Sequence, residues 1–156
     1  MRYSDQFKVV VAAVGVLLAA GGVQASDEVF RASNPTWKAE CGSCHIAYPP
    51  PLLPAESWKV MMAGLGHHFG SDASLDAAST AEILTFLEKN ASRRKLKTVA
   101  TPPLRITETS WFKREHDEVP AATWKNPLVK SAANCAACHV EAEQGNFSER
   151  SLRLPK

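Results

Sequence analysis

The sequence predicts a mainly α-helical fold with extensive loops, divided into two small halves. Apolar residues recur at spacings of three and four in 54–66 and again in 79–91, which is the period of an amphipathic helix. The pattern Cys-x-x-Cys-His occurs twice, at 41–45 and 135–139. Between the two patterns, residues 97–104 contain adjacent prolines typical of a linker. We therefore expect one pattern in each half.

Length and composition limit the protein to a small folded class. The chain has 156 residues, 45% of them hydrophobic, which excludes a large multi-domain enzyme and an intrinsically disordered chain. There are 18 Lys and Arg residues against 16 Asp and Glu residues, a net charge of +2. So small a charge gives no reason to expect a nucleic-acid partner.

Residues 1–25 have the features of a cleaved signal peptide. Arg2 and Lys8 precede an apolar run at 9–20, and Val23-Gln24-Ala25 places small residues at the positions that a signal peptidase reads. The alternative is an uncleaved membrane anchor, but a run of 12 residues is short for a bilayer. We expect cleavage after Ala25 and export of the rest of the chain.

The two predicted helices have start and stop signals. The first follows Pro54 and ends at Gly64 and Gly66, and the second has Ser79 or Thr80 as its cap. Their apolar stripes are formed by Trp58, Met61, Met62 and Leu65 in the first helix, and by Ile83, Leu84, Phe86 and Leu87 in the second.

The C-terminal half has weaker secondary-structure signals. Trp111-Phe112 is compatible with either a strand or a helical turn, and we expect a further short helix to carry Cys135 and Cys138. We predict an N-terminal domain at 26–98 and a C-terminal domain at 99–156.

The four cysteines occur only within the repeated pattern, as Cys41-Gly-Ser-Cys44-His45 and Cys135-Ala-Ala-Cys138-His139. This is the attachment pattern of c-type haem. Two thiols three positions apart on a helical turn reach the two vinyl-derived carbons on one porphyrin edge. The histidine that follows is then placed to ligate the iron. We expect two covalently bound haem c groups, with His45 and His139 as the proximal ligands.

Three other uses of the cysteines fit less well. A redox dithiol of the thioredoxin type needs a βαβ surround, which the sequence does not show. A structural zinc site does not require a histidine after each cysteine pair. A disulfide framework does not explain why the same pentapeptide pattern occurs twice.

Each half is too small to build a large core from side chains. The predicted mature chain has 131 residues, or about 65 for each haem. We therefore expect the haems to form much of the core. The four tryptophans are then interpreted as packing residues, with electron relay as the alternative use of Trp37, Trp58, Trp111 and Trp124.

Three histidines remain as candidates for the sixth position of each iron: His67, His68 and His116. Two methionines, Met61 and Met62, are also available, but they belong to a helical apolar stripe and are expected in the core. His45 and His68 are 23 residues apart, as are His116 and His139. This spacing makes local pairing within each half the simplest arrangement.

Several stretches of the sequence resemble the small dihaem cytochrome c family of the proteobacterial periplasm, whose best-known member partners an oxygen-binding monohaem cytochrome. The stretches that carry the resemblance are 41–50, 52–62, 67–75, 105–116, 131–139 and 145–147. The resemblance implies a periplasmic protein with two covalent haems and bis-histidine ligation. It identifies His68 and His116 as the distal ligands, with the adjacent His67 as the alternative to His68.

Two histidines on each iron would leave no open coordination position, so the expected function is single-electron transfer and not enzymatic catalysis. Bis-His ligation also favours a lower potential than Met/His ligation. The expected partner is another redox protein, either a c-type cytochrome or a membrane b-type cytochrome. The alternative function is a dihaem enzyme, a peroxidase or an O₂- or NO-reactive protein, with one open iron site. A sensor would require an output domain, which this chain does not show.

Charge gives little further information about docking. Four ionised haem propionates would make the exported protein weakly negative. One basic cluster follows the second predicted helix, and its simplest interpretation is a solvated helix end formed by Arg93, Arg94, Lys95 and Lys97.

Overall fold

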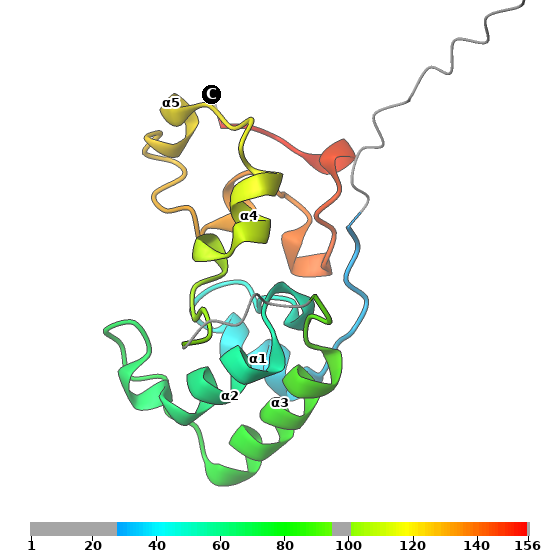
Figure 1. Cartoon of the computed structure of the whole chain (residues 1–156), viewed down its shortest axis with the longest axis vertical. Coiled ribbons are helices and arrows are strands. Elements are labelled where there is room, and N and C mark those ends of the chain that lie inside the picture. Colours follow the sequence, from blue (N-terminus) through cyan, green and yellow to red (C-terminus); the bar gives the residue numbers. More distant parts are fainter. Residues whose placement is uncertain (1–27, 95–100, 156) are drawn as a thin grey trace, which may run out of the picture.

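A computed structural model describes residues 28–94 and 101–155. The predicted signal peptide at 1–25 and residues 97–100 of the predicted linker lie outside this range. Within it, regular structure is helical and β-pairing is limited to isolated bridges, which confirms the predicted fold class. No helix in the described ranges is long and apolar enough to cross a bilayer. The α-helices in Figure 1 are α1 (Pro35–Gly42), α2 (Ala55–Ala63), α3 (Ala77–Asn90), α4 (Ser110–Glu115) and α5 (Ala121–Trp124).

Short 3₁₀ turns occupy much of the space between these helices. In chain order they are η1 (Pro50–Leu52), η2 (Leu65–His67), η3 (Ile106–Glu108), η4 (Cys135–Ala137), η5 (Ala142–Gln144) and η6 (Glu149–Ser151).

Helix α1 brings the chain into the first Cys-x-x-Cys-His pattern. The side chain of Asn34 caps it by accepting a hydrogen bond from the Trp37 amide at 2.7 Å, and Pro35 occupies the first helical position. Cys41 lies in the last turn, so the first half of the pattern is helical and the second half leaves the helix.

The predicted helix at 54–66 is present, but it is divided. Helix α2 ends at Ala63, where the Gly64 amide donates to the Met61 carbonyl at 3.0 Å, and the chain then forms η2. Glycine is a poor helix former, so a tight turn replaces the last predicted helical turn. This division places His68 directly after η2.

Helix α3 begins two residues before the predicted start, and its cap is not Ser79 or Thr80. Asp76 is the cap, because its Oδ1 accepts hydrogen bonds from the Ala78 and Ser79 amides at 2.8 and 3.0 Å. Ser79 instead lies in the first turn and donates its hydroxyl to Asp76 Oδ2 at 2.6 Å.

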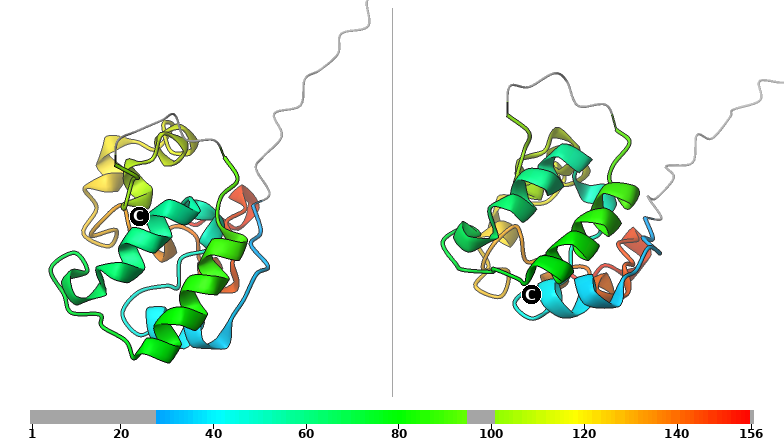
Figure 2. Two further views of the ribbon diagram at one scale, coloured as in Figure 1. Left: turned by 60° about the horizontal axis from the view of Figure 1, so that its bottom comes forward. Right: turned by 90° about the horizontal axis from the view of Figure 1, so that it is seen from below.

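The main side-chain core lies among α1, α2 and α3, and Figure 2 shows α2 and α3 side by side. Met61 packs against the core from its edge, so both methionines have the packing role predicted for them. The indole Nε1 of Trp58 donates to the Pro50 carbonyl at 2.8 Å, which satisfies its polar group inside the core. The buried members are Trp37, Leu53, Trp58, Met62, Ile83 and Leu87.

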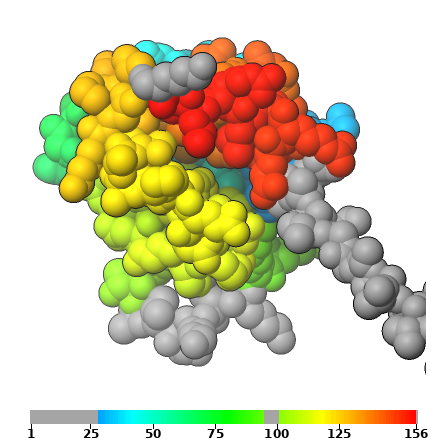
Figure 3. Space-filling model, turned by 90° about the horizontal axis from the view of Figure 1, so that it is seen from above, coloured from blue at the N-terminus to red at the C-terminus, as the bar shows by residue number. Residues whose placement is uncertain are grey.

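The C-terminal half contains short helices joined by turns. Trp111 and Phe112 belong to α4, so the helical alternative for this segment is correct, and Thr109 caps the helix through a 3.1 Å hydrogen bond from the Phe112 amide. Of the second cysteine pair, Cys135 begins the 3₁₀ turn η4 and Cys138 follows its last residue. Residues from this half make up most of the face in Figure 3.

The first described residues, 28–30, pair with the C-terminal half, and Figure 1 shows the chain reaching across from α1. The Phe30 amide donates to the Gly145 carbonyl and the Phe147 amide to the Glu28 carbonyl, both at 2.8 Å. Gly145 has a φ of +75°, and a Cβ there would collide with the Phe30 carbonyl oxygen. We call residues 28–30 the N-terminal strap. The division into domains 26–98 and 99–156 stays a prediction. The strap crosses the boundary of that division, because its partners are residues 145–147.

Candidate functional site

The structure brings His45 and His68 together. The centroids of their rings are 6.2 Å apart and the ring planes differ by 24°. His45 follows the loop at the end of α1, and His68 follows η2. Both side chains are partly buried, whereas the neighbouring His67 is exposed.

His116 and His139 form a second pair with the same spacing. Their ring centroids are also 6.2 Å apart, but their planes differ by 73°. His116 ends α4, and His139 follows η4. Each pair therefore joins the histidine of one Cys-x-x-Cys-His pattern to a histidine from the same half.

The distance between the two ring centroids of each pair can be compared with that expected for two histidines bound to one metal ion. A metal–imidazole bond is about 2.0 Å long, so two imidazoles on opposite sides of one metal have centroids about 6 Å apart. Both pairs have this separation. Two histidine pairs of this geometry, each beside a Cys-x-x-Cys motif, fit the axial positions of two haem groups.

Hydrogen bonds to backbone carbonyls orient one histidine of each pair. His45 Nδ1 lies 2.6 Å from the Ile46 carbonyl oxygen, and His116 Nδ1 lies 2.9 Å from that of Phe112. With the proton assigned to Nδ1 as the donor, Nε2 keeps the lone pair that binds a metal.

The other two histidines are favoured in their neutral form. Burial, and then the proximity of His45, lower the pKa of His68. Burial, and then His116, lower the pKa of His139. The Nδ1 atom of His139 is buried without a hydrogen-bond partner in the described chain, so this ring lacks a polar contact that a buried group needs.

A tight turn holds His68 in position. The Ser71 amide donates to the His68 carbonyl at 3.0 Å, and Phe69 adopts a φ of +50°, a strained conformation for a bulky residue. The Phe69 ring packs edge-on against His68 with a centroid distance of 4.9 Å, and the Arg105 guanidinium lies 4.1 Å above Phe69. Sequence reasoning missed Arg105, because nothing local in the sequence connects it with residue 68.

No disulfide joins any two of the four cysteines, and the environment of their side chains is not that of a redox dithiol. Burial raises the pKa of Cys41 and of Cys135 to about 11 and also raises that of Cys138. Redox-active dithiols instead have a lowered thiol pKa. The described residues contain no cluster of three or more His, Cys, Asp or Glu side chains suited to a metal ion alone.

Tyr48 contacts both motif regions and was also missed by sequence reasoning. Its ring stacks on His45 with centroids 4.6 Å apart, and its hydroxyl donates to the Ala133 carbonyl at 2.7 Å. Burial, and then the proximity of Cys135, raise the pKa of Tyr48 to about 12, so the hydroxyl keeps the proton that it donates.

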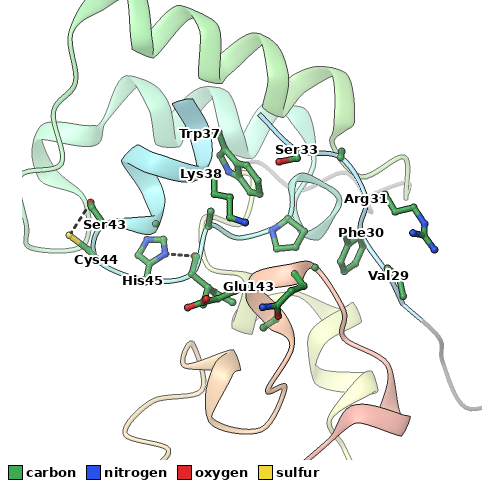
Figure 4. A pocket seen from close by; sticks show the side chains of 18 residues that line it. Val29, Phe30, Arg31, Ser33, Trp37, Lys38, Ser43, Cys44, His45 and Glu143 are labelled. Carbon is green, nitrogen blue, oxygen red and sulfur yellow. Dashed lines mark hydrogen bonds between the residues drawn. The ribbon is translucent and has the colours of Figure 1, made fainter. Parts of the chain in front are cut away.

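A cavity of about 690 Å³ borders the first motif (Figure 4). Its lining combines the N-terminal strap and the residues after it, helix α1, the motif residues Cys44 and His45, and η5 of the C-terminal half. Residues of both halves therefore line this cavity, which His45 of the first pair also lines.

The fold and the two motifs define a small helical c-type cytochrome with two haem groups. The chain belongs to the dihaem cytochrome c family, whose model matches residues 37–147 and so includes both motifs. It carries two haem c groups and has an electron-transfer role.

Solved structures agree with this assignment. A diheme cytochrome c from Rhodobacter sphaeroides is 46% identical, with a TM-score of 0.68 over 74% of this chain and 97% of the other. A diheme cytochrome type c from Shewanella baltica OS155 is 42% identical, with a TM-score of 0.68 over 78% of this chain and 93% of the other. A search of curated proteins finds no match.

Proposed function

We propose that this protein carries single electrons through two covalently attached, six-coordinate haems, each with two histidine ligands. Cys41 and Cys44 attach the first haem, and Cys135 and Cys138 attach the second. His45 and His68 are the axial ligands of the first iron, and His116 and His139 are those of the second. The observation that carries the proposal is the equal 6.2 Å separation of the two ring pairs.

The bound haem supplies an iron that changes its oxidation state by one electron. The protein's residues hold that iron in a constant ligand set. The backbone carbonyls of Ile46 and Phe112 orient His45 and His116, and the turn after η2 holds His68. Rings on both sides of each iron leave no position for O₂ or peroxide, so we propose a carrier and not a peroxidase or a gas-reactive enzyme.

The ligands also indicate where the protein acts in a redox sequence. Bis-His ligation gives a lower potential than Met/His ligation, because a methionine ligand raises the potential. A low potential suits an electron donor to another haem protein. We propose a c-type cytochrome or a membrane b-type cytochrome as the redox partner.

We also propose a periplasmic location, supported by the signal-peptide features of residues 1–25. N-terminal sequencing of the protein exported by a Gram-negative host tests this proposal. Cleavage after Ala25 gives Ser26 as the first residue. Retention of residues 1–25 would contradict it.

Carbon monoxide binding to the reduced protein tests the ligand assignment. We expect no spectral change in the wild type, because both irons are six-coordinate. His68→Ala and His116→Ala should each open one iron to CO while the other stays unreactive.

The matched control for this test is His67→Ala, which removes the adjacent exposed histidine and should bind no CO. CO binding by the wild type would contradict the proposal. So would a His67→Ala variant that binds CO when His68→Ala does not.

A further inference from the structure

Tyr48 joins the two motif regions through two direct contacts. Its ring stacks on His45 at 4.6 Å with the planes 19° apart, and its hydroxyl donates to the Ala133 carbonyl at 2.7 Å. Ala133 is two residues before Cys135, and the Cys135 amide donates to the same carbonyl oxygen at 3.0 Å. One side chain therefore connects a residue of the first pattern with the backbone that begins the second.

Three other side-chain contacts between the halves each include residues beside one histidine pair or beside neither. Arg105 packs on Phe69 beside His68, and its other side-chain contact is an ion pair with Glu108, which includes no histidine. Phe30 packs on Phe147, which contacts His139 at 5.1 Å and so reaches only the second pair. A third contact places the Arg94 guanidinium 4.8 Å from the ring of Trp111, and it includes no histidine.

The connection through Tyr48 is short in physical terms. It consists of one ring stack, one side chain and one hydrogen bond, followed by covalent backbone from Ala133 to Cys135. Electronic coupling decays more slowly through covalent bonds and hydrogen bonds than across open gaps. The hydroxyl is held as a donor because it has a carbonyl acceptor at a favourable distance.

We propose that Tyr48 is the coupling residue between the two haem sites, an inference that rests on the proposed electron-transfer function. Electrons exchange between the sites along the route His45, Tyr48, Ala133 and Cys135. In each event one ferrous iron loses an electron and the ferric iron of the other site gains it. No bond is formed or broken, and no proton moves.

Two variants separate the contributions of ring and hydroxyl. Tyr48→Phe keeps the ring on His45 and removes the hydrogen bond to Ala133. Tyr48→Leu removes both contacts. The matched control is Trp111→Leu, which removes the contact between Arg94 and Trp111 across the same two halves, a contact that includes no histidine.

Interhaem exchange can be measured by proton NMR on the partly reduced protein. Haem methyl resonances of the two sites differ, and broadening that is independent of protein concentration reports intramolecular exchange. Mass and absorbance spectra first establish that each variant holds two low-spin haems, so a failure of the proposed function is recognised separately. Amide hydrogen exchange at 133–139 is a second readout that does not depend on electron transfer.

We expect Tyr48→Phe to slow interhaem exchange severalfold and to speed amide exchange at 133–139, because the hydroxyl–carbonyl bond is lost. Tyr48→Leu should slow interhaem exchange further, and Trp111→Leu should match the wild type. The proposal is overturned if Tyr48→Leu exchanges electrons at the wild-type rate. It is also overturned if Trp111→Leu slows exchange as much as Tyr48→Leu, since general loosening of the two halves would then explain both.

Discussion

The two halves of the molecule are stabilised by different kinds of interaction. The N-terminal half buries a set of large side chains among α1, α2 and α3, whereas the buried apolar residues of the C-terminal half are Phe112, Val129 and Ala142. The second half depends more on backbone hydrogen bonds, such as that from the Arg153 amide to the Cys138 carbonyl at 2.9 Å. The comparison teaches that similar motifs need not have similar support. In the C-terminal half, the N-terminal strap adds contacts from outside, and we propose that haem supplies the rest of the core.

The largest effect should come from removing the second haem. Replacing Cys138 with Ala should leave this haem singly linked or absent, and the C-terminal half should then lose protection from amide exchange, because it has little side-chain core of its own. Cys44→Ala is the matched variant in the first motif. We expect it to leave α2 and α3 protected, since their packed residues include Ile83 and Leu87.

Mass spectrometry of the denatured proteins checks the attachment itself. The wild type should exceed its polypeptide mass by two haem groups, and each cysteine variant should retain the unaltered haem. If the C-terminal half of Cys138→Ala were as protected from amide exchange as that of the wild type, the inferred difference in how the two halves are stabilised would be wrong.

A smaller effect is expected at the N-terminal strap. Gly145→Ala places a Cβ against the Phe30 carbonyl at a φ of +75°, so the strap must shift or the backbone must strain. A residue held in such a conformation costs about 1–3 kcal/mol, which should appear as a lower free energy of unfolding. Chemical denaturation followed by circular dichroism measures it.

Gly64→Ala provides the control for this substitution. A Cβ at Gly64 would make only ordinary contacts, at 3.4 Å and beyond, and the residue caps helix α2 with a φ of −110°. We expect little change or a slight gain in stability. Equal destabilisation by the two substitutions would argue against the collision at Phe30.

A still smaller effect on stability is expected at the N-cap of α1, in the N-terminal half, which has the larger side-chain core. Asn34→Ala removes the acceptor for the Trp37 amide and should lower the free energy of unfolding by about 1 kcal/mol. Asn34→Asp keeps an acceptor at the cap and should retain most of the stability. A loss in Asn34→Asp as large as in Asn34→Ala would show that another contact of Asn34, such as its hydrogen bond to Glu82, dominates.

The smallest expected difference between the two halves lies in the spectra of their irons and involves no change in stability. The ring planes differ by 24° in the first histidine pair and by 73° in the second. Near-parallel imidazoles separate the energies of two iron d orbitals, whereas near-perpendicular ones leave them close together. Electron paramagnetic resonance of the oxidised protein should therefore show one ordinary rhombic low-spin signal and one signal with a much larger maximum g value.

His116→Ala tests which signal belongs to which site. It should remove the signal with the large maximum g value and leave the rhombic signal in place. Two identical rhombic signals in the wild type would contradict the difference between the pairs.

Local patterns in the sequence predicted much of this structure. The helical periods predicted α2 and α3, and the equal spacing along the chain predicted that each histidine pair comes from one half, where the ring centroids lie 6.2 Å apart. The sequence did not predict the cap of α3, since Asp76 lies before the apolar repeat and competes with Ser79 and Thr80 as an acceptor. Local pattern therefore predicts the presence of a helix better than its first residue.

Contacts across the chain were beyond sequence reasoning. Tyr48 stands three residues after His45, and nothing in that spacing shows that its hydroxyl reaches Ala133. The same is true of Arg105 above Phe69, and of the strap on Gly145. These contacts depend on how the halves pack, which no single-segment pattern records.

The N-terminal strap has a consequence for the order of maturation. Its residues precede everything else in the described chain, whereas their partners at 145–147 are synthesised long after them. Contacts between such distant residues form late, because a long loop must close first. Phe147, which receives the strap, also packs against His139. The surroundings of the second histidine pair are therefore completed only after residue 147 has been synthesised, whereas the two rings of the first pair, His45 and His68, belong to a much earlier part of the chain.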